Sequence, residues 1–354
     1  MNPGSRRPPR RLVALLLTLA WSAGAATGAH AAVFTQIAPG LDQTCGLRGD
    51  GIVYCWGNGR NGQLGVIGEL SARVPIKVIG SYQTTQITSG QQYWCERLAD
   101  GTAACTGTNA FGQLGDGNLS TANFPQEVAS LSHVSRISAG VTTTCAVDSG
   151  AVFCWGDGSS GQLGNAIFQR DPQPVPVQVP GLTGATWVDV GATSACAVLS
   201  SGQVRCWGNT DDGKLGNSRT SLLTAADTPV SGMTAAKTVA VGDRFACALK
   251  ADGTVWCWGD NTFGELGNGT NTGSYVAVQV PGLTGVVNLD ASGLTACAVK
   301  SNGTAWCWGD GKLGQTGGGT RGIAPTPVQV QGITDAAQIG VSETTACLVS
   351  KSQV

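Results

Sequence analysis

A short phrase that returns about every fifty residues constrains this chain more than any other feature. The phrase is Cys-Trp-Gly followed by Gly-x-Leu-Gly. Its clear copies begin at Cys55, Cys154, Cys206, Cys257 and Cys307, and a weaker copy, Cys105-Thr106-Gly107, lies between the first two. Successive copies are 49 to 52 residues apart. A unit of this size cannot bury a core alone, so the period indicates one supersecondary unit stacked repeatedly.

The N-terminus does not belong to this pattern. Arg6, Arg7, Arg10 and Arg11 precede an apolar run over 12–21, and small residues follow up to Ala32. This order is typical of a cleaved signal peptide, and we assign residues 1–32 to it, with a frayed N-terminal helix as the alternative. The expected location is therefore secreted or periplasmic, with cell-surface association as a further option.

Composition and charge narrow the class of protein. Hydrophobic residues make up 42% of the chain and glycine occurs 53 times, which favours a turn-rich β globule over a disordered chain. Without residues 1–32 the chain carries 17 basic and 22 acidic side chains. No basic block remains, so neither nucleic acid nor an anionic membrane is expected as the main partner. No later segment is long and apolar enough to span a membrane.

Thirteen cysteines in an exported chain indicate a disulfide framework. They fall in close pairs around turn signals such as Gly49-Asp50-Gly51, and folding about such a loop brings the two cysteines face to face. Zinc or redox chemistry is the alternative, but it needs other spacings or more histidine than His133 supplies. The predicted disulfides are Cys45–Cys55, Cys95–Cys105, Cys145–Cys154, Cys196–Cys206, Cys247–Cys257 and Cys297–Cys307, with Cys347 as a free thiol.

The same hairpin arithmetic places a tryptophan opposite a small residue in five units. In the second unit the order is reversed, because Trp94 stands opposite Thr106. The exchange keeps the volume of the pair nearly constant, so we interpret Trp94 as a core residue rather than a binding aromatic. The predicted structural aromatics are Trp56, Trp94, Trp155, Trp207, Trp258 and Trp308.

Each unit reads as four short antiparallel strands. A β-branched strand precedes the Cys-to-Cys hairpin, and a proline-flanked edge strand such as Pro176–Pro180 follows the glycine loop. Four-stranded units repeated radially form a β-propeller, so the expected fold is all-β. The repeats are placed at 33–81, 82–132, 133–184, 185–234, 235–285 and 286–333, with a partial seventh at 334–354.

These motifs resemble the repeats of the regulator-of-chromosome-condensation (RCC1) family, which build seven-bladed propellers. The paired cysteines and the signal sequence depart from family members in the nucleus. The sixth unit, with its Gly-x-Leu-Gly read at 311–314, shortens its loop to five residues from tryptophan to leucine, instead of eight. The seventh unit stops after Cys347, whose partner is expected near position 357. We expect a truncated product, with six-bladed closure plus an appended hairpin as the alternative.

No constellation of an active site, metal site or cofactor site is found. His133 is interpreted as a strand-end residue, since no nucleophile motif accompanies it. Asp116-Gly117-Asn118 lacks the further oxygen ligands that calcium needs. The pair Asp211-Asp212 is interpreted as solvated loop charge. The chain is thus expected to be a non-enzymatic monomer without cofactor.

Three functions remain open. The favoured one is an exported propeller that binds an unidentified protein or cell-surface partner through its face loops, with Ile167, Phe168 and Arg170 as a candidate binding loop. The second is inhibition of an extracellular enzyme, since a secreted bacterial β-lactamase inhibitor is similar in architecture. The third, implied by the family resemblance, is guanine-nucleotide exchange, which an exported chain is poorly located to perform.

Overall fold

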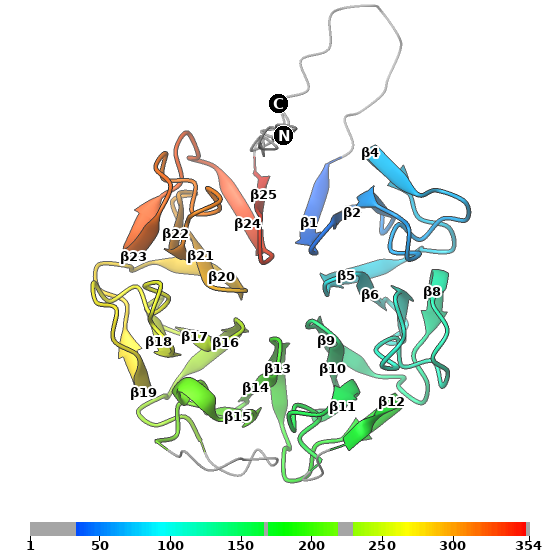
Figure 1. The fold of residues 1–354 in the computed structure, drawn as a ribbon, viewed down its shortest axis with the longest axis horizontal. Coiled ribbons are helices and arrows are strands. Elements are labelled where there is room, and N and C mark those ends of the chain that lie inside the picture. Colours follow the sequence, from blue (N-terminus) through cyan, green and yellow to red (C-terminus); the bar gives the residue numbers. More distant parts are fainter. Residues whose placement is uncertain (1–32, 166–168, 219–228, 352–354) are drawn as a thin grey trace, which may run out of the picture.

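The protein is a ring of small antiparallel sheets around a central axis (Figure 1). The computed structural model describes residues 33–165, 169–218 and 229–351. Within these residues the sheets form seven blades, each with its first strand nearest the axis and its later strands toward the rim. The seventh blade has two strands, and together with the first it closes the ring. The expected β-propeller is confirmed, and a six-bladed ring with an appended hairpin is wrong.

The first three blades have four strands each. Their strands are β1 (Phe34–Pro39), β2 (Gln43–Arg48), β3 (Val53–Asn58) and β4 (Ser71–Lys77); β5 (Thr84–Ser89), β6 (Tyr93–Leu98), β7 (Ala103–Gly107) and β8 (Ala122–Glu127); and β9 (Val134–Ala139), β10 (Thr143–Asp148), β11 (Ala151–Gly158) and β12 (Gln169–Gln178).

In blade 4 the described residues give three strands and a single bridge between Arg205 and Pro229, and a short 3₁₀ turn, η1 (Asp211–Gly213), lies in its loop. The strands of blades 4 to 7 are β13 (Ala185–Val190), β14 (Ser194–Leu199) and β15 (Val204–Gly208); β16 (Ala236–Val241), β17 (Phe245–Lys250), β18 (Val255–Gly259) and β19 (Ser274–Gln279); β20 (Val286–Ser292), β21 (Thr295–Lys300), β22 (Ala305–Asp310) and β23 (Ile323–Gln329); and β24 (Ala336–Val341) and β25 (Ala346–Ser350).

The predicted hairpin register is present in each of the six cysteine-paired blades. Cys45 lies directly opposite Cys55 on β2 and β3, and the other five pairs are opposed in the same way. All six predicted disulfides occur among the described residues, with Cα–Cα distances of 4.0 to 4.1 Å. The shorter Cys145–Cys154 hairpin turns through Ser149 and Gly150, both at positive φ, as a two-residue loop requires.

Tryptophans join neighbouring blades at the outer part of the ring. The indole Nε1 of Trp258 in blade 5 donates to the carbonyl of Lys214 in the Gly-x-Leu-Gly loop of blade 4, at 2.9 Å. The next glycine of that loop, Gly216, has φ +65°, and a Cβ there would lie 2.8 Å from the indole. Glycine is therefore required both by its backbone and by the tryptophan that packs on it. Equivalent contacts join Trp155 to Gln113, Trp207 to Gln162 and Trp308 to Glu265.

We call the contact between a tryptophan and the glycine loop of the preceding blade the clasp. Blades 1 and 2 depart from it. Trp94 is fully buried on β6, as predicted, and Thr106 stands at the tryptophan position of blade 2. The Thr106 hydroxyl donates to the carbonyl of Ala122 at 2.9 Å and lies 3.3 Å from that of Gly62 in the loop of blade 1. Trp56 is half-buried and packs against Phe34, with 5.8 Å between ring centroids.

The sixth glycine loop corrects the sequence alignment. The amide of Gly317 donates to the carbonyl of Gly314, as Gly65 does to Gly62, and the Leu313 amide donates to the side chain of Gln315. The motif of blade 6 is thus 314–317, with buried Thr316 at the leucine position, and the reading at 311–314 is wrong. The loop therefore has the usual length. Its backbone geometry requires two glycines with a buried residue between them, and Thr316 is that buried residue.

Side chains on the innermost strands form a second set of links around the axis. Gln36 receives the amide of Ile87 and donates to the carbonyl of Thr85 in the next blade. Gln338 of blade 7 makes the same two bonds to the backbone of Ile37, at 2.7 and 3.1 Å, and so joins the last blade to the first. These amide side chains replace the backbone hydrogen bonds that separate sheets cannot make to one another.

Charged side chains take part in this inner set. Asp189 accepts from the Ser138 hydroxyl and the Val241 amide, and Asp290 accepts from the Val341 amide at 2.6 Å. Residues of all seven blades line an axial cavity of about 270 Å³, and Asp189 and Asp290 are among them. The guanidinium of Arg136 lies 3.5 Å over the Trp187 ring in the same cavity. Burial, and then the nearby Asp189, raise the pKa of Asp290 to about 7.

The clasp predicts different costs for two glycines of similar backbone. Gly282→Ala changes a residue at φ +72° with open space around its Cβ position, so about 1 kcal/mol is expected from the left-handed backbone alone. Gly267→Ala adds a Cβ 2.9 Å from Trp308, so roughly 3 kcal/mol is expected. Denaturant unfolding of the two variants measures the difference. Equal losses would contradict the clasp.

The raised pKa of Asp290 predicts a pH dependence of stability. The folded protein binds this proton more tightly than the unfolded chain does, so stability is fully present below about pH 4 and is lost as the pH rises toward about 7. Asp290→Asn keeps an acceptor for the Val341 amide and should flatten melting temperature against pH over this window. Asp252→Asn is the control, because hydrogen bonds from Thr254 lower the pKa of Asp252. A profile unchanged by Asp290→Asn would contradict this assignment.

Candidate functional site on the loop face

One face of the propeller carries the long loops. The connections between first and second strands and between third and fourth strands lie together there, as shown by the hydrogen bond from the Asn58 amide to the Asp42 carbonyl. The opposite face carries the tight hairpins, such as the one ending at Gly51. We call the first of these the loop face.

The Gly-x-Leu-Gly motif itself presents one side chain per blade on this face. In most blades residue x is glutamine or glutamate, whose side-chain oxygen accepts the amide of the residue just before the motif. We call that residue the presenting position, since its backbone is held while the repeat makes no use of its side chain. These bonds are Asn61 to Gln63, Phe111 to Gln113, Ser160 to Gln162, Phe263 to Glu265 and Leu313 to Gln315, at 2.8 to 3.0 Å.

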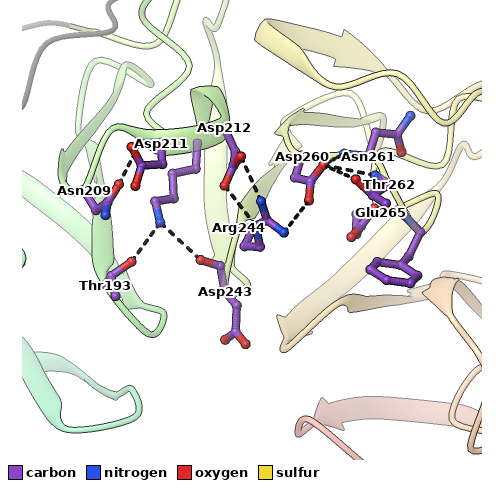
Figure 2. Close-up of polar contacts among 12 residues, drawn as sticks. Thr193, Asn209, Asp211, Asp212, Asp243, Arg244, Asp260, Asn261, Thr262 and Glu265 are labelled. Atoms are coloured by element: carbon purple, nitrogen blue, oxygen red, sulfur yellow. Dashed lines mark hydrogen bonds and ion pairs between the residues drawn. The ribbon is translucent and has the colours of Figure 1, made fainter.

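Blade 4 breaks the rule because its residue x is a lysine, which has no acceptor. The Nζ of Lys214 instead donates to the Thr193 hydroxyl at 2.8 Å and lies 3.5 Å from the Asp243 carbonyl (Figure 2). Burial lowers the pKa of Lys214. The loop folds into η1, and Asp212, at the presenting position, takes a left-handed backbone with φ +63°.

Asp212 is used by an ion pair, so its interpretation as solvated charge is wrong. The guanidinium of Arg244 in blade 5 makes two bonds of 2.9 Å to the Asp212 carboxylate and lies 3.3 Å from Asp260 (Figure 2). The two-pronged geometry is the strongest that arginine and carboxylate can make. It joins the loops of blades 4 and 5, residues far enough apart in sequence that spacing does not reveal the pair.

A buried carboxyl lies beneath this ion pair. Glu265 is fully buried, and its Oε1 has no hydrogen-bond partner among the described residues. Burial raises its pKa to about 7. Nearer the axis, burial and then the Glu343 carboxylate raise the pKa of Asp243 to about 6. The floor of the face thus gains negative charge around neutral pH.

Apolar side chains continue the cluster toward blade 6. The Nζ of Lys312 lies 4.1 Å from the centre of the Phe263 ring, a cation–π contact between blades 5 and 6. Leu313 beside it is 48% exposed. We call Asp212, Arg244, Phe263, Lys312 and Leu313 the blade 4–6 patch. Its mixture of an ion pair, an aromatic ring and an exposed leucine is a composition that protein interfaces use.

The site residues predicted from sequence do not lie in the blade 4–6 patch. Five of the six structural tryptophans are fully buried and serve the core, while Trp56 is half-buried. Ile167 and Phe168 lie outside the described residues, as does the side chain of Arg170. Cys347 is unpaired in the described part of the chain, and burial raises the pKa of its thiol to about 11, so it is a weak nucleophile.

Two classes of site have no counterpart in the described ranges. Residues 33–165, 169–218 and 229–351 contain no group of three or more His, Cys, Asp or Glu side chains placed to hold a metal ion. None of their helical segments is long and apolar enough to cross a bilayer. The blade 4–6 patch was missed from sequence, although the residue preceding each Gly-x-Leu-Gly would have located two of its members, Asp212 and Phe263.

Sequence comparisons find the same repeat along the chain. Two family profiles, both described as the regulator of chromosome condensation (RCC1) repeat, match residues 34–63, 236–265 and 286–315, and residues 50–95, 100–147, 149–198 and 252–296. The human E3 ubiquitin-protein ligase HERC2 is 33% identical over 41% of this chain and 3% of its own length. The Arabidopsis thaliana ultraviolet-B receptor UVR8 is 36% identical over 41% of this chain and 33% of its own length. The matches thus span a third or less of these relatives.

Solved structures share the architecture. Yeast RCC1 (Prp20), in a structure with Kap60, has a TM-score of 0.78 at 19% identity over 90% of this chain and 81% of its own. Human WBSCR16 has a TM-score of 0.79 at 21% identity over 90% and 87%. At this identity the likeness shows the fold alone, but the family profiles together cover more than half of the chain. The protein therefore belongs to the regulator of chromosome condensation (RCC1) repeat family.

Proposed function

We propose that this protein is an exported, non-enzymatic propeller that binds a protein partner through its loop face. The observation that carries the proposal is the presenting position. At this position the repeat holds the backbone of Phe111, Phe263 and Leu313 without using their side chains in the motif, and in blade 4 the ion pair with Arg244 holds the side chain of Asp212 instead. Side chains that differ from blade to blade on a common rigid frame suit recognition of a large, shaped surface.

Export is supported by two independent features. Six disulfides indicate an oxidising compartment, because thiols are kept reduced in the cytosol. The basic, apolar and small-residue order of residues 1–32 matches a signal peptide. The periplasm or the external medium is therefore the compartment we propose, and the partner is sought there.

Relatives support binding to protein without naming the partner. Structures of yeast RCC1 were obtained bound to Kap60, and those of Prp20p address its binding to Gsp1p and histones. These partners belong to those proteins. For the present chain we infer only that it binds protein. The identity of a partner depends on the compartment and on the loop-face side chains, and both are specific to this chain.

Inhibition of an extracellular enzyme is a narrower form of the same proposal. It is favoured by Phe111 and Leu313, which are 42% and 48% exposed on the loop face and could fill the active-site cleft of a hydrolase. Tight binding that blocks a defined hydrolase, such as a β-lactamase, separates inhibition from scaffolding.

Capture experiments on the patch test the proposal. A disulfide-intact protein carrying a photo-crosslinker at Lys312 is exposed to periplasm or medium, and the crosslinked species is identified and repurified. Phe263→Ala and Leu313→Ala should each weaken its binding about tenfold or more, as removal of a central apolar contact does. Phe124→Ala, at a phenylalanine that is 45% exposed on the outer strand β8, is the control and should leave binding unchanged.

Two outcomes would contradict this assignment. Binding that the patch variants leave intact would move the partner to another surface. Capture of a nucleotide-free GTPase as the specific partner would restore nucleotide exchange, the function implied by the wider family, over partner binding outside the cytosol.

A further inference from the structure

The outer edge of blade 1 exposes more apolar surface than a repeat edge requires. The strand β4 lies at the rim of the ring (Figure 1), and large apolar side chains belong to residues before, on and after it. Each is more than half exposed. They are Ile67 (69%), Leu70 (66%), Val74 (65%), Ile79 (53%) and Tyr82 (63%). We call this set the blade 1 edge.

The other blades provide an internal comparison. In blades 1, 2, 5 and 6 the same number of residues separates the last glycine of the motif from the valine that directly follows the outer strand, so positions correspond one to one. Small or polar residues, glycine or proline occupy nearly all of the equivalent sites, except that Phe124 and Val276 match Val74. The equivalents are Gly117, Ser120, Phe124, Ala129 and Ser132; Gly269, Thr272, Val276, Pro281 and Thr284; and Gly319, Gly322, Thr326, Gln331 and Thr334.

Among the outer strands of blades 1, 2, 5 and 6, only β4 carries basic residues, although Lys312, at the site of Arg60, and Arg321 are exposed in the loop before β23 of blade 6. Arg73 and Lys77 are exposed on β4, and Arg60 is exposed in the preceding loop, against two acids, Glu69 and Asp42, the second of which lines a surface hollow with Arg60 and Leu70. At the site of Arg73 the other three blades carry Asn123, Tyr275 and Pro325, and at the site of Lys77 they carry Glu127, Gln279 and Gln329. The blade 1 edge therefore carries more basic than acidic side chains, although the chain as a whole has a net negative charge.

We propose that the blade 1 edge docks on an anionic lipid surface. Aliphatic side chains that protrude among basic ones insert between lipid headgroups. The basic side chains bind lipid phosphates. Tyrosine is enriched at the boundary between membrane and water. The apolar residues occur before, on and after β4, a strand of seven residues or roughly 24 Å, rather than being gathered around one pocket. A protein partner would instead concentrate its contacts on a few central anchors.

Docking by an edge has a geometric consequence. The propeller axis would lie along the membrane surface, so the loop face would stand perpendicular to it and stay open. The proposal is therefore independent of the partner-binding function and compatible with it. A protein held in this way would present its blade 4–6 patch on the side of the ring away from the membrane (Figure 1).

Vesicle sedimentation tests the proposal. The protein is recovered after export, its N-terminus is verified by mass so that residues 1–32 do not contribute, and it is mixed with phosphatidylcholine vesicles with or without phosphatidylglycerol. We expect binding to the anionic vesicles that weakens at high ionic strength. Arg73→Glu with Lys77→Glu should weaken binding at least tenfold, since each basic residue near the surface contributes about fivefold. Ile67→Ser with Leu70→Ser and Val74→Thr should abolish it.

The matched control removes similar side chains from other rims. Phe124→Ser and Val276→Thr, at the Val74 position of blades 2 and 5, should leave vesicle binding unchanged, and far-ultraviolet circular dichroism with thermal melting verifies that every variant is folded. No binding to either vesicle, equal binding to neutral and anionic vesicles, or binding that the edge variants do not reduce would overturn the proposal. In the first case the edge would be left to a protein occupant.

Discussion

The contact between a tryptophan of one blade and the glycine loop of the preceding blade is the constraint on which this structure depends. The indole of Trp258 donates to the Lys214 carbonyl and packs where Gly216 has no Cβ, and three further junctions repeat the arrangement. Each blade is a small sheet that cannot bury its own faces, so its stability comes from its neighbours. Tryptophan and glycine therefore recur together because one fills the space that the other leaves.

Two further devices act on the same frame. The disulfides tie the second and third strands within a blade, and side chains such as Gln36 and Gln338 tie the first strands of neighbouring blades at the axis. With the backbone so constrained, differences between repeats become informative. The lysine at position 214, the ion pair from Arg244 to Asp212 and the apolar edge of blade 1 are all departures from the repeat, and the two proposed surfaces lie at such departures.

Much of this fold could be predicted from sequence because its rules are local. The distance from Cys45 to Cys55 sets a hairpin register, and the swap of Trp94 with Thr106 is visible once that register is drawn. The sixth loop was misread because residues 311–314 match the Gly-x-Leu-Gly motif in sequence. In the structure Thr316, not a leucine, fills the buried position of the loop. Asp212 pairs with Arg244 because blades 4 and 5 are neighbours in the ring. The spacing of residues in the sequence does not predict this contact.

Hydrogen exchange of the tryptophan indole protons tests the clasp most directly. In a ¹⁵N-labelled, disulfide-intact protein, we predict that the Nε1 protons of Trp155, Trp207, Trp258 and Trp308 exchange slowly and together, because each is buried and bonded to a neighbouring blade. The half-buried Trp56 should exchange much faster. Exchange of Trp258 or Trp308 at the rate of Trp56 would show that the blades are not joined in this way.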